Sequence, residues 1–453
     1  MTSDKVVNFK SLSENVGRFN LRNKTFLIPE MNRIGAHLLA ATFRGFGIHA
    51  RVMETHKGLA LGMAHTSGKE CYPCQITTGD ILHFMRTESD RLGEAFDPEE
   101  YVYFMPEADG PCRFGMYNKY QRIVLDSFPE LDRLKIGSLT TGDGYSLNGI
   151  IEPERVRDLR KVAYLSQVVG DILDRLLWRI RPYEAEPGRT DRFIEEAMHR
   201  MSEAFETHGP DMAFERIFAR MDEVLKEGKS IMDPAIPRKP LIGVVGEIYL
   251  RTHVKANQDV IRMLEKYGAE VVNASVCEWM NYTSYDRFRE ARQGFWYGLR
   301  QLSPSTMKRF LKAIVGFGGD LYYQQFRQKQ TFERACSIID MARDHRIGHL
   351  EHILKEEDLF SFDVGTEACL SIAGLVAYVR EGYNGLVNVY PFTCMPSTTT
   401  SAIVRPLMNK MRVPYLDTPY DSSYQPGREA SIRTFMYQAE QHFKRYGRKG
   451  NKG

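Results

Sequence analysis

Residues 24–53 read KTFLIPEMNRIGAHLLAATFRGFGIHARVM, and this stretch decides the expected fold. It opens on the apolar run 25–29 and closes on 48–53, each of which predicts a strand. Between them, residues 33–46 place apolar side chains at helical spacing. A strand, a helix and a strand of this length predict a parallel βαβ unit, from which doubly wound α/β folds are built.

The same alternation recurs on both sides of a helical region. Further strands are predicted at 101–105, 241–245, 269–274 and 385–390, with helical patterns after them. Residues 152–228 keep helical spacing without a strand pattern. We therefore predict an α/β fold with two doubly wound, Rossmann-like domains and a helical block between them. The expected parts are a polar N-terminal segment (1–23), an α/β domain with a C-x-x-C pair (24–150), the helical domain (151–237), a second α/β domain with a helical insertion (238–440) and a basic flexible tail (441–453).

Composition excludes several functional classes. Hydrophobic residues make up 43% and charged residues 26% of the chain, as in ordinary globular proteins. With 61 basic and 58 acidic residues the net charge is +3, so we expect no nucleic-acid partner. No apolar run is long enough for a membrane span, and residues 1–23 lack the apolar core of a signal peptide. These patterns predict a cytoplasmic protein that does not bind membranes.

Four of the seven cysteines lie where ligands are expected to bind. Cys71 and Cys74 form a C-x-x-C pair just before a helical pattern at 75–85, and a helix N-terminus favours thiolates. Cys112 and Cys394 each follow a predicted strand and precede a predicted helix, which places them at the carboxyl edge of a sheet. Four thiols meeting between two α/β domains would suit an iron–sulfur cluster.

Other interpretations of the cysteines stay open at this point. A single C-x-x-C pair also suits a zinc half-site or a thioredoxin-like dithiol. The second C-x-x-C pair of a zinc ribbon is absent, and the poorly patterned residues 56–69 separate the pair from the preceding strand. We expect the remaining cysteines, Cys277, Cys336 and Cys369, to pack in the core. The chain has no complete phosphate-loop motif, so any ATP energy must come from a partner.

Five motifs occur in a fixed order along the chain. They are GKECYPC (68–74), GPCRFG (110–115), GVVGEIY (243–249), EWMNY (278–282) and PFTCMP (391–396). Over about residues 24–440 the chain thereby resembles iron–sulfur proteins related to 2-hydroxyacyl-CoA dehydratase subunits, including acyl-CoA dehydratase activase-related proteins and the C-terminal part of CoA activases. Benzoyl-CoA reductases and double-cubane cluster proteins are neighbours in the same superfamily.

The resemblance implies an oxygen-sensitive [4Fe–4S] cluster where the α/β domains meet, as in anaerobic enzymes. Matched to the motifs, Cys71, Cys74, Cys112 and Cys394 are its expected ligands. Dehydratase subunits hold their cluster with three cysteines and leave one iron open. Four ligands would close the cluster and favour electron transfer. A double-cubane [8Fe–9S] cluster needs six cysteines and would recruit two of those assigned to the core.

The expected function follows from this resemblance. It is an iron–sulfur redox enzyme that accepts low-potential electrons from an ATP-hydrolysing iron–sulfur activase and reduces a small molecule or an acyl-CoA. The alternatives are a catalytic subunit of a 2-hydroxyacyl-CoA dehydratase-type enzyme and a zinc-binding structural or regulatory protein. Arg113 is expected to donate hydrogen bonds to cluster sulfides, and Glu247 to move a proton or orient a ligand. We also expect a homodimer or a heterodimer.

Overall fold

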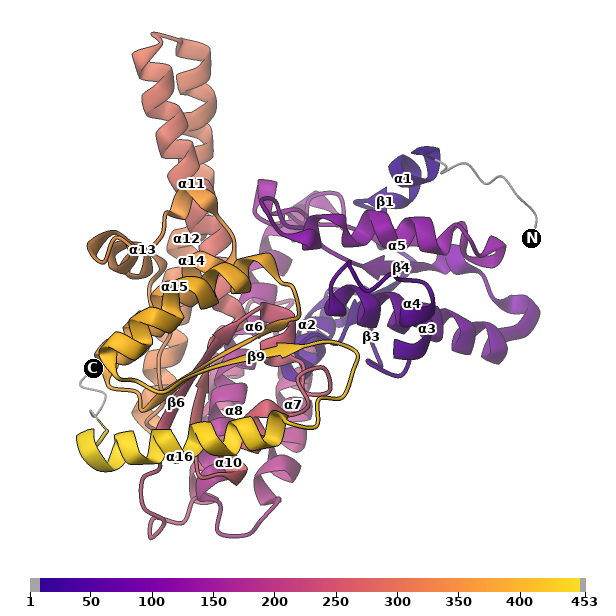
Figure 1. The fold of residues 1–453 in the computed structure, drawn as a ribbon. Coiled ribbons are helices and arrows are strands. Elements are labelled where there is room, and N and C mark those ends of the chain that lie inside the picture. The colour runs from indigo at the N-terminus through magenta and orange to yellow at the C-terminus, as the bar shows by residue number, and fades with distance from the viewer. Residues whose placement is uncertain (1–8, 449–453) are drawn as a thin grey trace.

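Two parallel sheets organise the protein. The computed structural model describes residues 9–448 and is an α/β structure (Figure 1). One sheet has five strands in the order β1-β5-β4-β2-β3, and the other has four in the order β7-β6-β8-β9. Every pairing among the described strands is parallel. Parallel strands require crossover connections, so helices alternate with strands and cover the sheets.

The first sheet contains the βαβ unit predicted at 25–53. Its strands are β1 (Val16–Gly17), β2 (Thr25–Pro29), β3 (His49–Met53), β4 (Tyr101–Phe104) and β5 (Lys135–Gly137). The helices of this region are α1 (Phe9–Asn15), α2 (Arg33–Gly45), α3 (Leu59–Ala64), α4 (Tyr72–Leu92) and α5 (Tyr117–Leu125). β2 pairs with β3 along its whole length, and its three central residues are buried. The apolar run at 25–29 therefore forms the strand that it predicted.

Three long helices separate the two sheets along the chain. They are α6 (Pro153–Ile180), α7 (Arg189–His208) and α8 (Phe214–Ser230), and the described residues 153–230 contain no sheet strand. α6 packs against α2 where two glycines meet: a Cβ on Gly170 would lie 3.2 Å from Cα of Gly35. The helical pattern predicted at 152–228 is therefore confirmed, and it joins the first sheet through α2.

The second sheet is largely buried. Its strands are β6 (Leu241–Gly246), β7 (Glu270–Asn273), β8 (Gly385–Pro391) and β9 (Tyr415–Tyr420). Its helices are α9 (Ile248–Thr252), α10 (Val260–Lys266), α13 (Ile347–Glu356), α14 (Glu367–Glu381), α15 (Met395–Met411) and α16 (Arg428–Tyr446). All six residues of β6 are buried, as expected for a parallel strand covered on both faces.

Both ends of the described chain differ from the prediction. The segment expected to be merely polar at 1–23 includes α1 and β1, although residues 1–8 lie outside the described part. The second α/β region does not end at 440, because α16 continues to Tyr446 and Arg448 binds Glu270 at 2.6 and 2.9 Å. Of the expected basic tail, residues 449–453 lie outside the described part. The pattern also missed β9, an edge strand whose Pro419 and polar residues hide its periodicity.

A helical hairpin projects from the body, as Figure 1 shows. It consists of α11 (Val276–Arg300) and α12 (Pro304–Ile338), and it is the helical insertion predicted within the second α/β region. The two helices approach closely at Gly294, where a Cβ would lie 2.4 Å from the ring of Phe310. Among the described residues, no helix combines the length and the apolar character that a membrane crossing requires.

Candidate cofactor site between the two sheets

A cavity of about 330 Å³ is lined by residues from both sheets. Pro29 at the end of β2 and Phe104 at the end of β4 come from the first sheet. Glu247 directly after β6 and Pro391 at the end of β8 come from the second. Ligands of parallel α/β sheets bind at the carboxyl ends of the strands, so this cavity is the candidate site.

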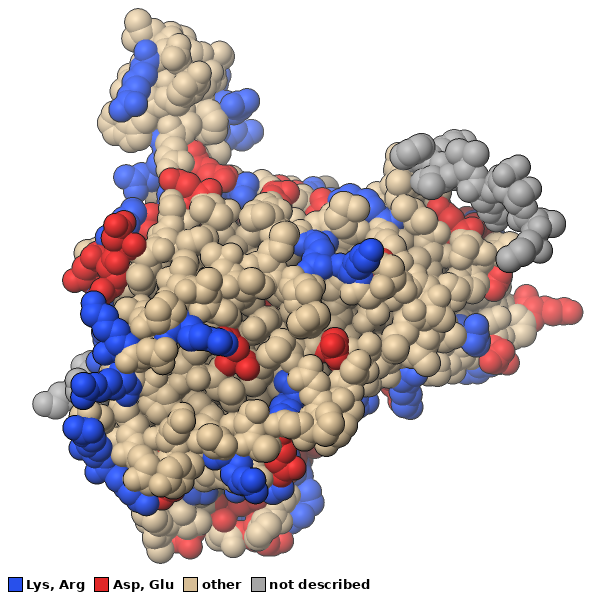
Figure 2. Space-filling model, in the orientation of Figure 1, with Lys and Arg blue, Asp and Glu red and all other residues tan. Residues whose placement is uncertain are grey.

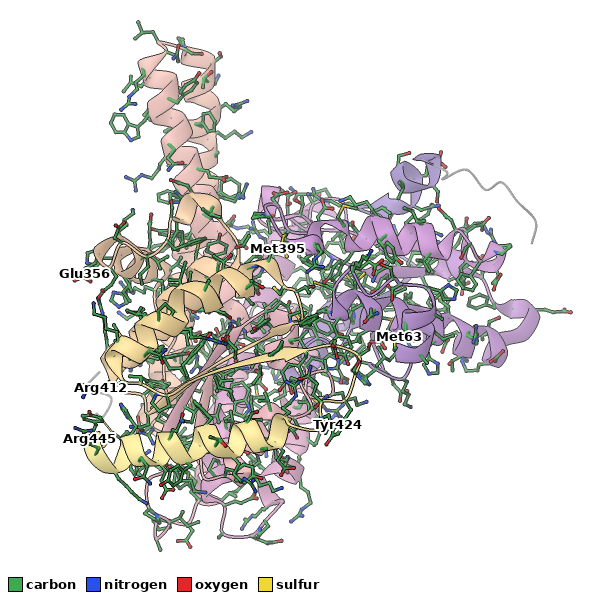
Figure 3. The ribbon with its side chains drawn as sticks, viewed as in Figure 1. Met63, Glu356, Met395, Arg412, Tyr424 and Arg445 are labelled. Atoms are coloured by element: carbon green, nitrogen blue, oxygen red, sulfur yellow. The ribbon has the colours of Figure 1, made fainter. Side chains whose placement is uncertain are left out.

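Three cysteines line the cavity, each at the start of a helix. Cys71 is the N-cap of α4, Cys112 the N-cap of the 3-10 helix η3 (Arg113–Met116) and Cys394 the N-cap of α15. Met395, the first residue of α15, lies at the end of that helix nearest the first sheet's elements (Figure 3). Helix N-termini offer unpaired N–H groups and the positive end of the helix dipole, so all three thiols lie where negative charge is favoured.

Nearby donor groups lower the pKa of each thiol. The Tyr117 hydroxyl has this effect on Cys71, the backbone N–H of Phe114 on Cys112, and the backbone N–H and hydroxyl of Ser397 on Cys394. None of the three thiols accepts a hydrogen bond that caps its helix.

In the protein without a bound cation, burial raises the pKa of the thiols by more than the helix N-termini and the nearby donor groups lower it. It raises the pKa of all three thiols, that of Cys112 to about 12. The nearby carboxyl groups of Glu247 and Glu367 raise the three pKa values further. The thiols are therefore protonated at pH 7, and a metal centre would have to displace their protons and supply positive charge.

The fourth predicted ligand, Cys74, is not among the residues that line the cavity, although Pro73 and Thr77 are. Its side chain is fully buried in the same core cluster as Cys71, and its Sγ lies 3.9 Å from Oγ1 of Thr78. The structure thus brings together three of the four cysteines that the motifs indicate. Cys277, Cys336 and Cys369 pack in or against the hydrophobic cores, as expected from the sequence.

Two carboxyl groups face the same cavity from the second sheet. Glu247 caps α9 by accepting hydrogen bonds from the backbone N–H groups of Tyr249 at 3.0 Å and Leu250 at 2.9 Å. Glu367, the first residue of α14, accepts from the backbone N–H of Ile248 at 2.8 Å.

These two carboxyl groups titrate above their usual range. Burial raises the pKa of both, and the charge of Glu247 helps to raise that of Glu367 to about 8. Glu367 is therefore protonated at neutral pH. The pair can supply a proton inside the cavity.

Arg113 connects the loops that carry the cysteines. Its guanidinium donates hydrogen bonds to the backbone carbonyls of Lys69 and Thr393 and, at 3.2 Å, to Oγ1 of Thr393. The two terminal nitrogens thus bind backbone and hydroxyl oxygens, and the charge of the guanidinium lowers the pKa of Cys71. Donation from Arg113 to cluster sulfides stays a prediction. Because Lys69 precedes Cys71 and Thr393 precedes Cys394, Arg113 holds the two sheets' cysteine loops together.

A residue with positive φ lies at or just before each of the five site residues. Cys71 itself has φ = 110°, and a residue with positive φ lies one or two positions before each of the other four site residues. These are Gly110 (φ 93°), Gly246 (φ 126°), Thr366 (φ 74°) and Thr393 (φ 66°). Such conformations are costly for residues with a side chain and concentrate at functional sites. Here they turn each chain so that a helix begins at the cavity.

The remaining lining of the cavity is mainly apolar. It includes Phe26, Ile28, Leu147, Ile150, Trp279 and Met280. Trp279 and Met280 lie on α11, so the base of the projecting hairpin forms part of the wall. A ligand with an apolar portion would bury it here next to the thiols.

The arrangement of the thiols does not suit a single metal ion. Within residues 9–448, no group of three or more His, Cys, Asp or Glu side chains is placed to hold one. No protein-family model and no curated protein matches the chain.

Glu367 and Tyr117 were missed from the sequence. A threonine and a glutamate directly before an apolar helical pattern indicate a helix start, so Thr366 and Glu367 could have been recognised as an N-terminus. That signal would have placed Glu367 at a helix start, as the cysteines are. Tyr117 gives no comparable signal, because an aromatic residue in a half-buried helix is usually part of the core.

Proposed function

We propose that the protein is an iron–sulfur redox enzyme and that Cys71, Cys112 and Cys394 hold its cluster. The observation that carries the proposal is that three cysteines at helix N-cap positions and a carboxylic acid pair line one cavity. A cluster bound there would supply low-potential one-electron transfer. A protein with that chemistry and a proton donor in the same cavity can reduce a bound molecule.

The donor set fits a cubane cluster better than zinc. Structural zinc needs four ligands around one ion, whereas each cysteine of a cubane binds a different iron. Cys71, Cys112 and Cys394 all line the cavity, and the proposal assigns each of them to a different iron. The donor groups near the sulfurs and the helix N-termini would offset the negative charge of a cluster.

Three cavity thiols favour an open iron over a closed cluster. Since Cys74 is buried in the core, a [4Fe–4S] cluster would have one coordination position free for a ligand in the cavity. This supports the second candidate function, a catalytic subunit of the 2-hydroxyacyl-CoA dehydratase type, over simple electron relay. Glu367 would then donate a proton to the bound molecule, Glu247 would orient it, and the apolar wall would hold its acyl portion.

The electrons are proposed to come from a partner. The chain lacks a complete phosphate-loop motif, and the five motifs resemble proteins that receive electrons from an ATP-hydrolysing iron–sulfur activase. The substrate class that this resemblance suggests is an acyl-CoA thioester or another small molecule. All seven cysteines are free thiols, which suits a reducing cytoplasm.

The first experiment measures metal and acid-labile sulfide in protein purified without oxygen. We expect about four irons and four sulfides per chain. About eight irons would indicate a double cubane that recruits further cysteines. About one zinc without sulfide would contradict the proposal and leave a structural or regulatory protein.

A second measurement separates the open cluster from the closed one. Cyanide added to the reduced protein should shift its electron paramagnetic resonance spectrum if one iron lacks a protein ligand. An unchanged spectrum would indicate a cluster closed by a fourth residue and would favour electron relay.

A further inference from the structure

The projecting hairpin carries an unusual surface on α12. Leu311, Val315, Tyr322 and Phe326 are 52, 70, 73 and 47% exposed, and Gly319 lies among them. Their spacing of three or four residues places all five on one side of the helix. We call this surface the α12 stripe. Solvent-facing sides of helices are normally polar, and a continuous exposed apolar patch marks an interaction site.

The glycine of the stripe has no explanation within the chain. At Gly319 an added Cβ would meet no atom within 4 Å beyond the backbone of its own helix turn. Packing inside the molecule therefore does not require glycine at this position, although glycine weakens a helix. A helix from outside could use it to approach the α12 backbone closely.

We propose that a second copy of this chain packs antiparallel along the α12 stripe. The stripe is symmetric about its centre between Gly318 and Gly319: Leu311 and Val315 lie on one side, and Tyr322 and Phe326 at equal distances on the other. A two-fold axis there would place Leu311 opposite Phe326 of the partner subunit and Val315 opposite Tyr322 of the partner subunit. Such self-complementarity is what an isologous dimer interface requires.

The distribution of charge disfavours a parallel second copy. Residues 291–319, which form the tip, contain no acidic residue but five cations: Arg292, Arg300, Lys308, Arg309 and Lys312. Figure 2 shows blue groups on the projecting end. At the base of the hairpin the acidic side chains Glu290, Glu333 and Asp363 are paired with cations of the same chain. Parallel pairing would place two cationic tips side by side, whereas antiparallel pairing keeps them apart.

The size of the stripe predicts a weak dimer. Its four large side chains, paired across two copies, would bury on the order of 1,000 Å² in total, at the low end for specific interfaces. A dissociation constant in the micromolar range is therefore expected. The proposal does not depend on the cofactor, because the α12 stripe lies outside the cavity lining.

Sedimentation velocity of the full-length holoprotein tests the surface. Between about 1 and 100 μM the wild type should convert from monomer to dimer. Val315→Glu should remain monomeric over this range, with unchanged helix content by circular dichroism. The matched control is Leu302→Glu, because Leu302 is 83% exposed at the tip and lies outside the stripe. A monomeric wild type, or a control as disruptive as Val315→Glu, would overturn the proposal.

Cysteine cross-linking tests the register. Gly319→Cys, next to the two-fold axis, should form an intermolecular disulfide with its own copy under mild oxidation. Lys312→Cys should not, since its two copies would lie about 20 Å apart and a disulfide needs Cα atoms within about 7 Å. The wild type sets the background from its native thiols. Equal cross-linking of the two variants would show that the pairing is not the one proposed.

Vesicles test the competing occupant, an anionic membrane. With vesicles of phosphatidylcholine containing about 30% phosphatidylserine, we expect no co-sedimentation at low or high salt, whereas the apolar dimer should persist at about 0.5 M salt. Binding that disappears both in high salt and in Val315→Glu would assign the stripe to a lipid surface and overturn the dimer.

Discussion

The two sheets build one cavity with different chemistry. The first sheet contributes two thiols, Cys71 and Cys112, whereas the second contributes one thiol, Cys394, and two carboxyl groups, Glu247 and Glu367. Both use the same device, a residue at the start of a helix reached through a backbone turn of positive φ. One architecture therefore presents thiols from both sheets and carboxyl groups from the second sheet alone.

This difference suggests a division of labour. Neither sheet alone presents three thiols, so a cluster would bridge the two sheets and hold them together. The second sheet adds Glu367, whose proton is retained at neutral pH, and this group suits chemistry on a bound molecule rather than retention of a metal. Changes in the first sheet should thus affect cofactor content, and changes to the second sheet's carboxyl groups should affect protonation.

The largest effect is expected from the cavity thiols. Cys112→Ser from the first sheet and Cys394→Ser from the second should each lose about 90% of the iron, because each removes one of three ligands. Cys74→Ser is the matched control and should keep wild-type iron, since its side chain packs in the core. Iron and sulfide per chain, measured under anaerobic conditions, give the result. Equal iron loss in Cys74→Ser would instead support four ligands.

Replacing the glycine before a site residue by alanine should destabilise the protein far more at the second sheet than at the first. A Cβ on Gly246 would lie 2.0 Å from the backbone oxygen of Val389, whereas on Gly110 the nearest atom, Cγ2 of Thr366, is 3.7 Å away. Gly246→Ala should lower the free energy of unfolding by about 4 kcal/mol or more, because the backbone must shift. Gly110→Ala should cost about 1 kcal/mol, from its positive φ alone. Urea unfolding at equilibrium measures both, and similar losses would contradict the steric argument.

The sequence predicted the strands and junctions well where apolar runs are continuous. The run at 25–29 coincides with β2, and 241–245 differs from β6 by one residue. β5 has three residues and β9 is a polar edge strand with a proline, so neither has enough periodicity to be recognised. Short and edge strands are defined by their partners rather than by their own pattern.

The errors in the site share one physical cause. The helix after the C-x-x-C pair was expected to start at 75, but α4 starts at Tyr72, so Cys74 lies inside its first turn and faces the core. At the second sheet, the helix that carries Glu367 was expected to start at 370, but α14 starts at Glu367 itself. A shift of three residues at a helix start decides which side chain faces the cavity. The apolar pattern locates helices well but their first turns poorly.

The contributions of two carboxyl groups to stability should depend on pH in opposite directions: Glu367 on α14 at the second sheet and Glu88 on α4 at the first. Glu367 has a pKa raised to about 8 by burial, so in metal-free protein its contribution to stability is fully present below about pH 4.5 and is lost as the pH rises towards 8. Glu367→Gln should therefore gain on the order of 3 kcal/mol relative to wild type at pH 8 and little at pH 5.

Glu88 on α4 is the matched control, because its contribution to stability should change with pH in the opposite direction. Hydrogen bonds from Arg51 lower the pKa of Glu88 to about 2, so its contribution is present above the ordinary carboxyl pKa and is lost as the pH falls towards 2. Glu88→Gln should consequently destabilise the protein at pH 7 and have a smaller effect at pH 3. Chemical unfolding of both variants across this pH range measures the difference, and the same sign for both would contradict the assignment.

The smallest effect is expected at Arg113, which joins the two sheets. Arg113→Lys keeps the charge, but a single ammonium group cannot bind the Lys69 and Thr393 carbonyls with the geometry of the guanidinium fork. The free energy of unfolding should change by less than about 1 kcal/mol. Iron release to a chelator should nevertheless become roughly three- to tenfold faster, because the cysteine loops open more often.

A surface pair provides the control for this substitution. Arg192→Lys makes the same change in an exposed ion pair with Glu186 at 2.9 Å and should leave iron release unchanged. If Arg113→Lys released iron at the wild-type rate, its hydrogen bonds would not be what keeps the cysteine loops together. The cluster itself would then be the main connection between the sheets at this site, and its removal alone should let them separate.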